Sequence, residues 1–352
     1  MLLFTLCVIP LLFSSCSKTT NEKKGLIIES EKTFVMPVKC PGLAEPCLDP
    51  ECSPYYSCNI IQNYGGVSVT YEKTSGMIKF NSVSDANTVI NKLLLDDSLW
   101  NTANDTQYGN YTVDQLDSID LAINFDEFKK FRDFENLFAG FVSKRKSLET
   151  LENTWLSNSF SGTDPDNLDF TFEDAENTVF NNQNKFKIGS NIYELKVDGL
   201  YINGLFQGDG GSQIVTNTTS PCISGKRHNL YSELQVPSRK YKLKVAVHSI
   251  GIRSSAKGKV VSFKQKSSGG WKRSRVQIAV ICGGNIYTTN CSFNFAFGIR
   301  KPSPSGFLKR KELEVPYRQW GSGGQIVYKT RPNETSATFQ LPSGFSANIL
   351  LF

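Results

Sequence analysis

The chain has 352 residues, 39 lysines and arginines, 33 aspartates and glutamates and two histidines, which gives a formal net charge of +6. This length is sufficient for two domains with cores of their own. Neither histidine lies in an H-E-x-x-H motif, and the sequence has no G-x-S-x-G motif and no glycine-rich phosphate loop. These absences exclude the usual signatures of zinc proteases, serine hydrolases and nucleotide-binding enzymes.

The N-terminus carries an export signal. "MLLFTLCVIPLLFSSC" has about a dozen apolar residues, fewer than the ~20 that a membrane-spanning helix needs, and ends in small residues before Cys16. Residues 12–16, "LFSSC", resemble a bacterial lipobox, so we expect residues 1–16 to be a lipoprotein signal peptide and Cys16 to be lipidated. The alternative is an ordinary cleaved signal with an incidental cysteine. No other run approaches membrane-spanning length, so the lipid would be the anchor to the membrane.

Residues 17–65 form a linker that is rich in cysteine and proline. It has little apolar content to bury, and an exported protein meets an oxidising environment, so two disulfides are favoured over a zinc site. The C-x6-C-x4-C-x5-C spacing also lacks the C-x2-C pairs typical of structural zinc. Three pairings remain open among these cysteines: Cys40, Cys47, Cys52 and Cys58.

Charge divides the rest of the chain. From residue 220 onward there are 22 lysines and arginines against 4 glutamates and no aspartate, a net charge of +18, which leaves −12 for residues 1–219. We therefore predict an α+β protein with an acidic, mainly helical domain at residues 66–220 and a basic, sandwich-like β domain at residues 221–352.

Apolar spacing in the acidic part predicts helices and one hairpin. A helix is expected from Ser82 or Ser84, and a phenylalanine-rich helix over residues 125–158, with a kink or close contact at Ala139-Gly140. We interpret its aromatic stripe as core. Residues 177–204 predict a short helix followed by a hairpin that turns at Gly189-Ser190-Asn191.

A family resemblance rests on these segments. The lipoprotein signal is followed by F-x-S-x6-V-I-x-x-L, a phenylalanine-rich helix ending in "LENTWLSN", and then "FKIGSNIYEL". In this order the chain resembles uncharacterised secreted lipoproteins of Bacteroides-type bacteria, over roughly residues 1–205. The resemblance implies an address in the cell envelope, as an outer-membrane lipoprotein on the periplasmic or the surface side, and no assigned chemistry.

The basic part alternates with period two. In "YKLKVAVHSIG", Leu243, Val245 and Val247 share one face, while Lys242, Lys244 and His248 share the other, which predicts a sheet with one wet face. "GGN" at residues 283–285 predicts a turn after Cys282. Both a Cys282–Cys291 bridge and two small buried side chains are compatible with the pattern.

Cations on the polar side of these strands form a candidate anion-binding face. Three interpretations are open: it binds an external polyanion such as an acidic glycan, it docks against the acidic part of the chain, or it is a solvated face. Nucleic acid is an unlikely ligand for an exported protein. The residues of this face are Lys242, Lys244, Lys257, Lys259, Lys264, Lys266, Trp271, Lys272, Arg273 and Arg275.

We assign no functional role to the other notable polar residues. His248 is expected at the surface. The acidic run at residues 164–176 does not match an EF-hand loop, so we interpret it as a solvated linker. We expect no catalytic residue, metal or cofactor. The sequence thus predicts an exported, lipid-anchored envelope protein with a non-catalytic binding role; the alternative is a structural or interaction component that binds another envelope protein.

Overall fold

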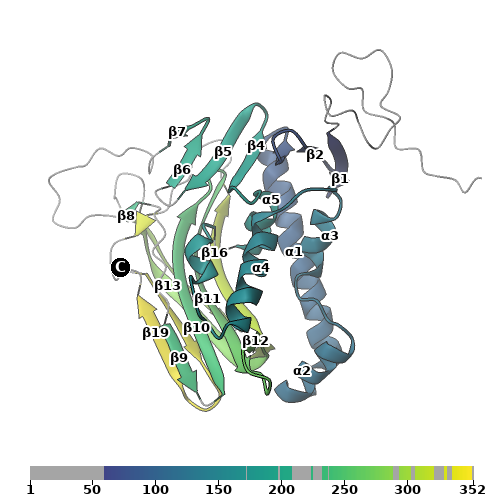
Figure 1. Ribbon diagram of the computed structural model, residues 1–352. Coiled ribbons are helices and arrows are strands. Elements are labelled where there is room, and N and C mark those ends of the chain that lie inside the picture. The colour runs from purple at the N-terminus through teal and green to yellow at the C-terminus, as the bar shows by residue number, and fades with distance from the viewer. Residues whose placement is uncertain are drawn as a thin grey trace, which may run out of the picture.

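A computed structural model describes residues 59–350, apart from 172, 197–198, 208–222, 225–231, 237, 288–292, 303–305, 321–328 and 331–334. The expected α+β class is confirmed (Figure 1). The five predicted positions at Cys16, Cys40, Cys47, Cys52 and Cys58 lie outside the described residues, so lipidation and the disulfides stay predictions.

The first part of the described chain, residues 59–207, contains a seven-stranded sheet in the order β1-β2-β3-β4-β5-β6-β7. Its neighbours are antiparallel except for β3 and β4, which are parallel because all the helices are inserted between them. The predicted hairpin is confirmed, with Ile188 paired to Asn191 around a Gly189-Ser190 turn. The predicted linker ended too late, because β1 already begins at Ile60. The strands are β1 (Ile60–Tyr64), β2 (Val67–Glu72), β3 (Met77–Phe80), β4 (Lys185–Ile188), β5 (Asn191–Lys196), β6 (Gly199–Ile202) and β7 (Leu205–Phe206).

Two helices follow β3. The Ser82 side chain accepts a hydrogen bond from the Asp85 amide and so caps α1, as one of the two predicted caps. The capping box of Thr112 and Gln115 starts α2. The bounds are α1 (Val83–Tyr108) and α2 (Val113–Ala122).

The phenylalanine-rich segment is not one helix. It is divided into α3 (Lys129–Glu135) and α4 (Lys144–Ser157), and Gly140 between them has a φ of +87°, which an L-residue rarely adopts. The helix is interrupted here rather than kinked, and the close contact that was the alternative prediction is present, because the Tyr71 hydroxyl donates a hydrogen bond to the Gly140 carbonyl at 3.0 Å. Its stripe is core, as expected, with Phe131, Phe134 and Phe138 buried against the first sheet. A 3-10 turn, η1 (Pro165–Leu168), and a short helix, α5 (Asp174–Val179), complete the helical layer.

The second part, residues 232–350 with β8 before it, has only strands among its described residues. One sheet has the order β12-β11-β10-β9, with β16 also paired to β11; the other has β19-β18-β13-β17-β8, with β14 and β15 paired to β13. The strands are β8 (Ile223–Ser224), β9 (Ser232–Val236), β10 (Arg239–Ser249), β11 (Arg253–Gln265), β12 (Trp271–Arg273), β13 (Val276–Tyr287), β14 (Phe293–Lys301), β15 (Leu308–Arg310), β16 (Glu312–Trp320), β17 (Lys329–Thr330), β18 (Thr335–Gln340) and β19 (Ser346–Leu350).

These two sheets stack on a shared apolar core. Leu243, Val245 and Val247 face into it, as their alternation predicted. A Cβ atom on Gly258 would lie 2.7 Å from the Ala337 Cβ, so a glycine at this position of β11 lets the two sheets approach closely.

The turn predicted at residues 283–285 is wrong. β13 runs through these residues and pairs Cys282 with Ile299, so the glycines are strand residues. Cys282 is a free, buried thiol, and burial raises its pKa to about 12, as expected of an inert side chain. Cys291 lies outside the described residues.

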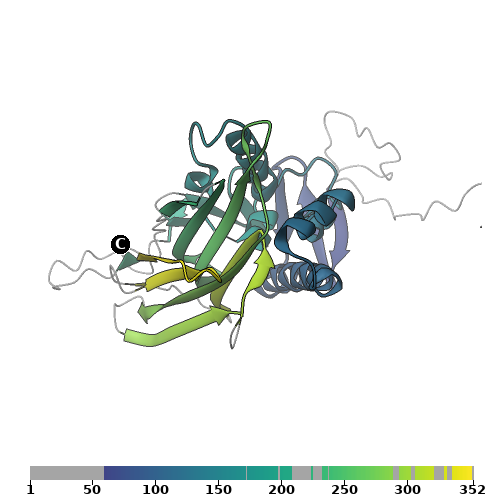
Figure 2. The same cartoon turned by 90° about the horizontal axis from the view of Figure 1, so that it is seen from below.

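The helices lie beside the first stacked sheet. Figure 1 shows α4 and α1 running alongside β10, β11 and β16, and Figure 2 shows the stacked sheets and the helical layer side by side from below. The tip of the β10–β11 hairpin joins the two parts, because Ile250 and Ile252 belong to the apolar core of the first part. None of the helices in the described residues is long and apolar enough to cross a membrane.

Candidate functional site

The predicted anion-binding face contains both buried and exposed residues. Four of its lysines lie on the side of β10 and β11 that the helices cover. Lys266 and Lys272, at the far end of the sheet, are exposed. The alternation was predicted correctly, but the polar face that it defines is interior. The four lysines are 1–5% exposed: Lys242, Lys244, Lys257 and Lys259.

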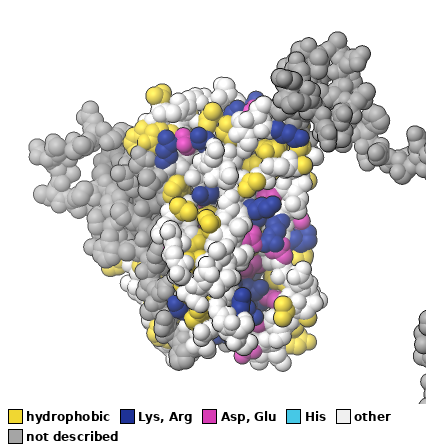
Figure 3. Space-filling model, in the orientation of Figure 1, with side chains coloured by type: hydrophobic (Ala, Val, Ile, Leu, Met, Phe, Trp, Pro, Cys, Tyr) yellow, Lys and Arg dark blue, Asp and Glu magenta, His cyan; other side chains and the backbone are white. Residues whose placement is uncertain are grey.

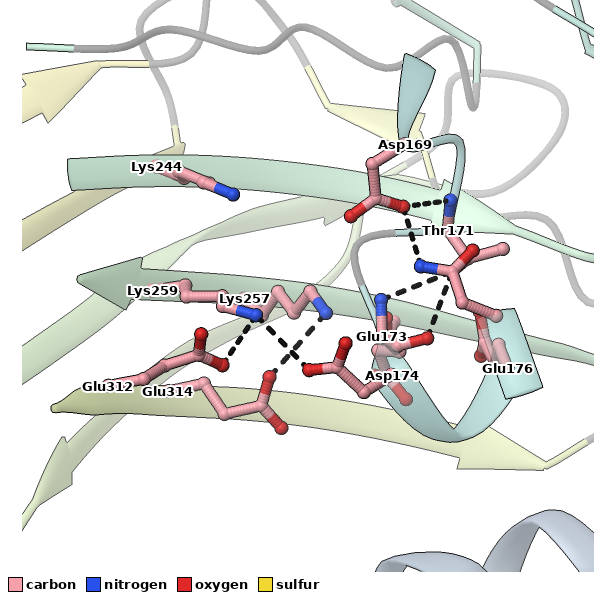
Figure 4. Close-up of polar contacts among 12 residues, drawn as sticks. Asp169, Thr171, Glu173, Asp174, Glu176, Lys244, Lys257, Lys259, Glu312 and Glu314 are labelled. Carbon is pink, nitrogen blue, oxygen red and sulfur yellow. Dashed lines mark hydrogen bonds and ion pairs between the residues drawn. The ribbon is translucent and has the colours of Figure 1, made fainter. Parts of the chain in front are cut away.

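Carboxylates from both parts of the chain neutralise these lysines. Lys257 and Lys259 lie 3.6 Å from Glu314 and 2.5 Å from Glu312, respectively, both on β16 of the second part. Lys242 and Lys244 both pair with Asp166 of η1. Lys259 Nζ lies 3.4 Å from a carboxylate oxygen of Asp174, at the start of α5 (Figure 4). Of the three interpretations of the cationic residues, docking against the acidic part of the same chain therefore accounts for Lys242 and Lys244, and in part for Lys259. Lys257 is instead paired within the basic part.

Four of the six remaining members of the face also have partners, whereas Lys266 and Lys272 stay exposed. Trp271 lies against Phe160, with ring centroids 5.2 Å apart. The ten residues therefore do not form one exposed surface, and the predicted face is corrected in this respect. The other ion pairs are Arg273–Glu152 at 2.7 Å, Arg275–Asp120 at 2.9 Å and Lys264–Asp114 at 2.9 Å.

The acidic run is not the solvated linker that we predicted. Glu173 and Glu176 are 1% and 0% exposed, and Asp169 is buried with its carboxylate accepting a hydrogen bond from the Asn177 amide at 2.8 Å. The segment was misinterpreted because its partners are 70 or more residues away in the sequence.

Glu173, Glu176 and His248 bring three ligand atoms within 4.8 Å of one another, a spacing that a metal ion could use. However, the Arg253 guanidinium, itself fully buried, pairs with both glutamates. Its positive charge lies where a cation would, so the group is an internal ion-pair cluster. His248, 2% exposed and 2.9 Å from Glu176, is not the surface residue that we expected.

The same histidine contacts a serine, which resembles the order of a catalytic triad. Ser255 Oγ lies 3.1 Å from His248 Nδ1 and 3.3 Å from Nε2. A hydroxyl aligned with one ring nitrogen would lie much farther from the other, so these near-equal distances are unsuitable for proton transfer. Ser255 is also fully buried. The arrangement is structural.

An open hollow lies between α1, the loop before α3, α5 and the strands β15 and β16. We call it the cleft. Its volume is about 210 Å³. A second hollow of about 390 Å³, beside α4, shares Phe125, Glu127, Phe128, Arg273 and Lys311 with it. Figure 3 shows basic and acidic side chains gathered side by side along the boundary beside α4.

The cleft is lined by both signs of charge in nearly equal number. From α1 it takes Leu94, Asp97, Ser98 and Asn101, whose spacing places them on one face of the helix. The cationic lining residues are Arg273, Arg275, Lys301, Arg310, Lys311 and Arg318, and the acidic ones are Asp97, Glu127, Asp174, Glu312 and Glu314.

Burial and mutual charge shift the pKa values of these groups. Burial, followed by the carboxylates of Asp174, Glu314 and Glu312, raises the pKa of Asp97 to about 8. Glu314 behaves oppositely: burial acts against ionisation, but Lys257 and Arg318 hold its pKa below the usual range. Two carboxyls of one cleft thus differ in protonation at neutral pH.

The aromatic rings of the cleft do not offer an open stacking platform. Phe125 stacks on Trp100 with an interplanar angle of 14°, and the Arg275 guanidinium lies 5.7 Å from the Phe125 centroid. Arg145 and Arg273 contact the Phe128 ring in the same way. A ligand in the cleft would therefore meet charged and hydrogen-bonding groups first.

Sequence reasoning missed most of this lining. None of these five residues was assigned to a ligand site from the sequence: Glu312, Glu314, Asp97, Ser98 and Asn101. The i, i+1, i+4 spacing of the last three on a predicted helix was the available signal, but nothing in the sequence shows which strands this face meets.

The fold and the cleft define an α+β protein with a charge-lined hollow between its helices and its sheets. No family model and no curated protein matches the chain. Among solved structures it is similar to a DUF4848 family protein from Bacteroides thetaiotaomicron, with 14% identity and a TM-score of 0.21, over 80% of this chain and 100% of that one. That neighbour belongs to a domain-of-unknown-function family of a Bacteroides species, but so distant a match supports no conclusion about activity.

Proposed function

We propose that this is an exported, lipid-anchored envelope protein with a non-catalytic binding role, and that its ligand site is the cleft. The observation that carries this proposal is the charged hollow at the junction of the helices and the second β part, since ligand sites favour such junctions. The near-balance of charge in its lining favours a small, polar ligand over a polyanion.

Experimentally, the cleft can be filled without changing the core. Ser98 is exposed and lines the cleft, and its neighbour Leu99 is 60% exposed and is not part of the lining. We expect Ser98→Phe to abolish ligand binding and Leu99→Phe to preserve it. The measurement is the shift in melting temperature with neutral, zwitterionic, cationic and anionic small compounds; equal shifts in both variants would contradict the proposal.

Anionic glycan binding through the strands is a second candidate, now limited to their exposed end. Lys266 and Lys272 are exposed beside the half-buried Trp271, and an aromatic ring among cations suits an acidic sugar. Retention on a heparin column should fall when both lysines are changed to glutamine. If the wild-type chain elutes at low salt, this candidate fails.

A further inference from the structure

Almost every charged group in the cleft has a partner within the protein. Arg318 Nη2 lies 2.9 Å from a Glu314 carboxylate oxygen, and Arg310 Nε lies 2.7 Å from one of Asp105. Lys311 is likewise 3.0 Å from Asp120. A ligand does not need to neutralise these groups.

Asp97 is different. Among the described residues no lysine or arginine nitrogen lies within ion-pair distance of its carboxyl group. The Asn101 side-chain amide donates a hydrogen bond to Oδ1 of Asp97 at 3.0 Å. The side chain is half-buried in the wall of the cleft. Its second oxygen is therefore left for something that enters the cleft.

The surroundings of Asp97 determine the charge that would be favourable there. Carboxylates face it from two other elements, Asp174 from α5 and Glu312 and Glu314 from β16. Cations face it more weakly, Arg310 from β15 and Lys301 from β14. Burial is the main cause of the raised pKa of Asp97, and the three carboxylates raise it further against the opposing Arg310. These carboxylates would stabilise a positive group at this point.

We infer that the ligand of the cleft carries a protonated primary amine and that Asp97 is the residue that receives it. This inference rests on the proposal that the cleft is the ligand site. An ammonium group has three donors, and the cleft offers acceptors for them in the Asp97 carboxylate, the Ser98 hydroxyl and the Asn101 side-chain oxygen on one face of α1. When the amine binds, Asp97 ionises and releases its proton to solvent.

The size and chemistry of the cleft limit the class of amine that could be its ligand. A hollow of about 210 Å³ suits a single ring or a short chain more than a polymer. Charge-paired arginines on the other walls can still donate hydrogen bonds to hydroxyl groups. Amino sugars and hydroxylated amines combine these features.

The test compares glucosamine with N-acetylglucosamine, which has the same ring but no charged amine. Calorimetric titration of the mature chain should show glucosamine binding, with a Kd at least tenfold lower than that of the acetylated sugar. In Asp97→Asn the Kd for glucosamine should rise at least tenfold. Asp133→Asn removes an exposed carboxylate that is not part of the cleft lining and should change nothing.

Proton release gives an independent readout. Titrations at pH 7 in two buffers of different ionisation enthalpy should show close to one proton released per bound glucosamine, and none in Asp97→Asn. If both sugars bind equally, or if glucosamine binds equally to the wild type and to Asp97→Asn, the amine inference is overturned. The cleft would still be supported as the ligand site if Ser98→Phe blocks that binding. If glucosamine does not bind at all, the inference fails, and the proposed function is judged by its own compound panel.

Discussion

Lys244 and Lys257 are both buried, but they differ in how closely a carboxylate compensates their charge. Lys244 is paired closely with Asp166. Lys257 is also buried, but its nearest carboxylate oxygen, on Glu314, is 3.6 Å away, and its ammonium has no hydrogen-bond partner among the described residues. Burial lowers the pKa of Lys257 to about 8. Its charge is thus a local cost to folding.

Lys257→Met should therefore stabilise the protein at pH 7, by about 1 kcal/mol, because an apolar side chain has no charge to desolvate. Glu314 keeps Arg318 as its partner, so no carboxylate is left alone. Lys244→Met should instead destabilise, because Asp166 loses one of its two lysines. Chemical denaturation measures both; a loss of stability in Lys257→Met would contradict this account.

The same group predicts a pH dependence. Between its folded pKa of about 8 and its ordinary value of 10.5, Lys257 is neutral when folded and charged when unfolded. The unfolded state then binds more protons, so stability rises with pH by about 1.4 kcal/mol per unit from this residue. Lys257→Met should remove that rise. If denaturation curves of the two proteins keep the same slope over this window, the lysine is not neutral in the fold.

At the scale of elements, one arginine attaches two helices to the second part. Arg275, 3% exposed, lies at the start of β13. Its Nε and Nη2 donate to the two oxygens of Asp120 on α2, and its Nη1 lies 3.0 Å from Asp105 on α1. Its backbone amide also donates to Asp117. Arg275 thus contacts both helices, and Arg310 and Lys311 add further ion pairs to the same two aspartates.

Arg275→Met should lower the free energy of unfolding by about 3–5 kcal/mol, because Asp120 stays buried with fewer partners. Amide exchange in α2 should accelerate more than in α4, which packs on the sheet through Trp155 and Leu156. Lys264→Met is the matched control, since the exposed Lys264 side chain pairs at 2.9 Å with the exposed Asp114 of α2 and its loss should cost less than about 1 kcal/mol. Equal effects of the two changes would contradict the assignment.

At the scale of the whole molecule, two separate apolar cores are joined through a largely charged boundary. One core lies under the first sheet and the other between the stacked sheets. Among the described residues, the apolar clusters that join the parts lie at the β10–β11 tip and around Trp155, Leu156 and Phe263. The cleft lies in the remaining boundary, which is made largely of paired charges.

The proposed anchor also belongs to this scale. Cys16→Ser should move the protein from the membrane fraction to the soluble fraction of cells, because no other segment is expected to hold it. Cys7→Ser changes a cysteine inside the apolar run and should leave the distribution as it is. Immunoblots of the two fractions measure the outcome, and a Cys16→Ser protein that stays with the membrane would contradict lipid anchoring.

Several elements of the fold could be predicted from local sequence patterns. The cap at Ser82, the hairpin turn after Ile188 and the inward set of Leu243, Val245 and Val247 could all be predicted, because each depends on residues a few positions apart. The strands β1 to β3 were missed, since they are short and precede the first strong helical signal. The turn at residues 283–285 was wrong because glycines are also tolerated within a long strand.

The sequence by itself determined that one face of β10 and β11 is apolar and the other charged, and that acidic and basic residues separate along the chain. It could not determine what covers the charged face. A lysine in alternation is equally compatible with water and with a carboxylate far away in the sequence, and only the tertiary structure brings Asp166 to Lys244 and Asp174 to Lys259. These ion pairs join residues that are far apart in the sequence, so they produce no periodic pattern from which they could be predicted. The boundary between the parts, and the cleft within it, are therefore visible only in the tertiary structure.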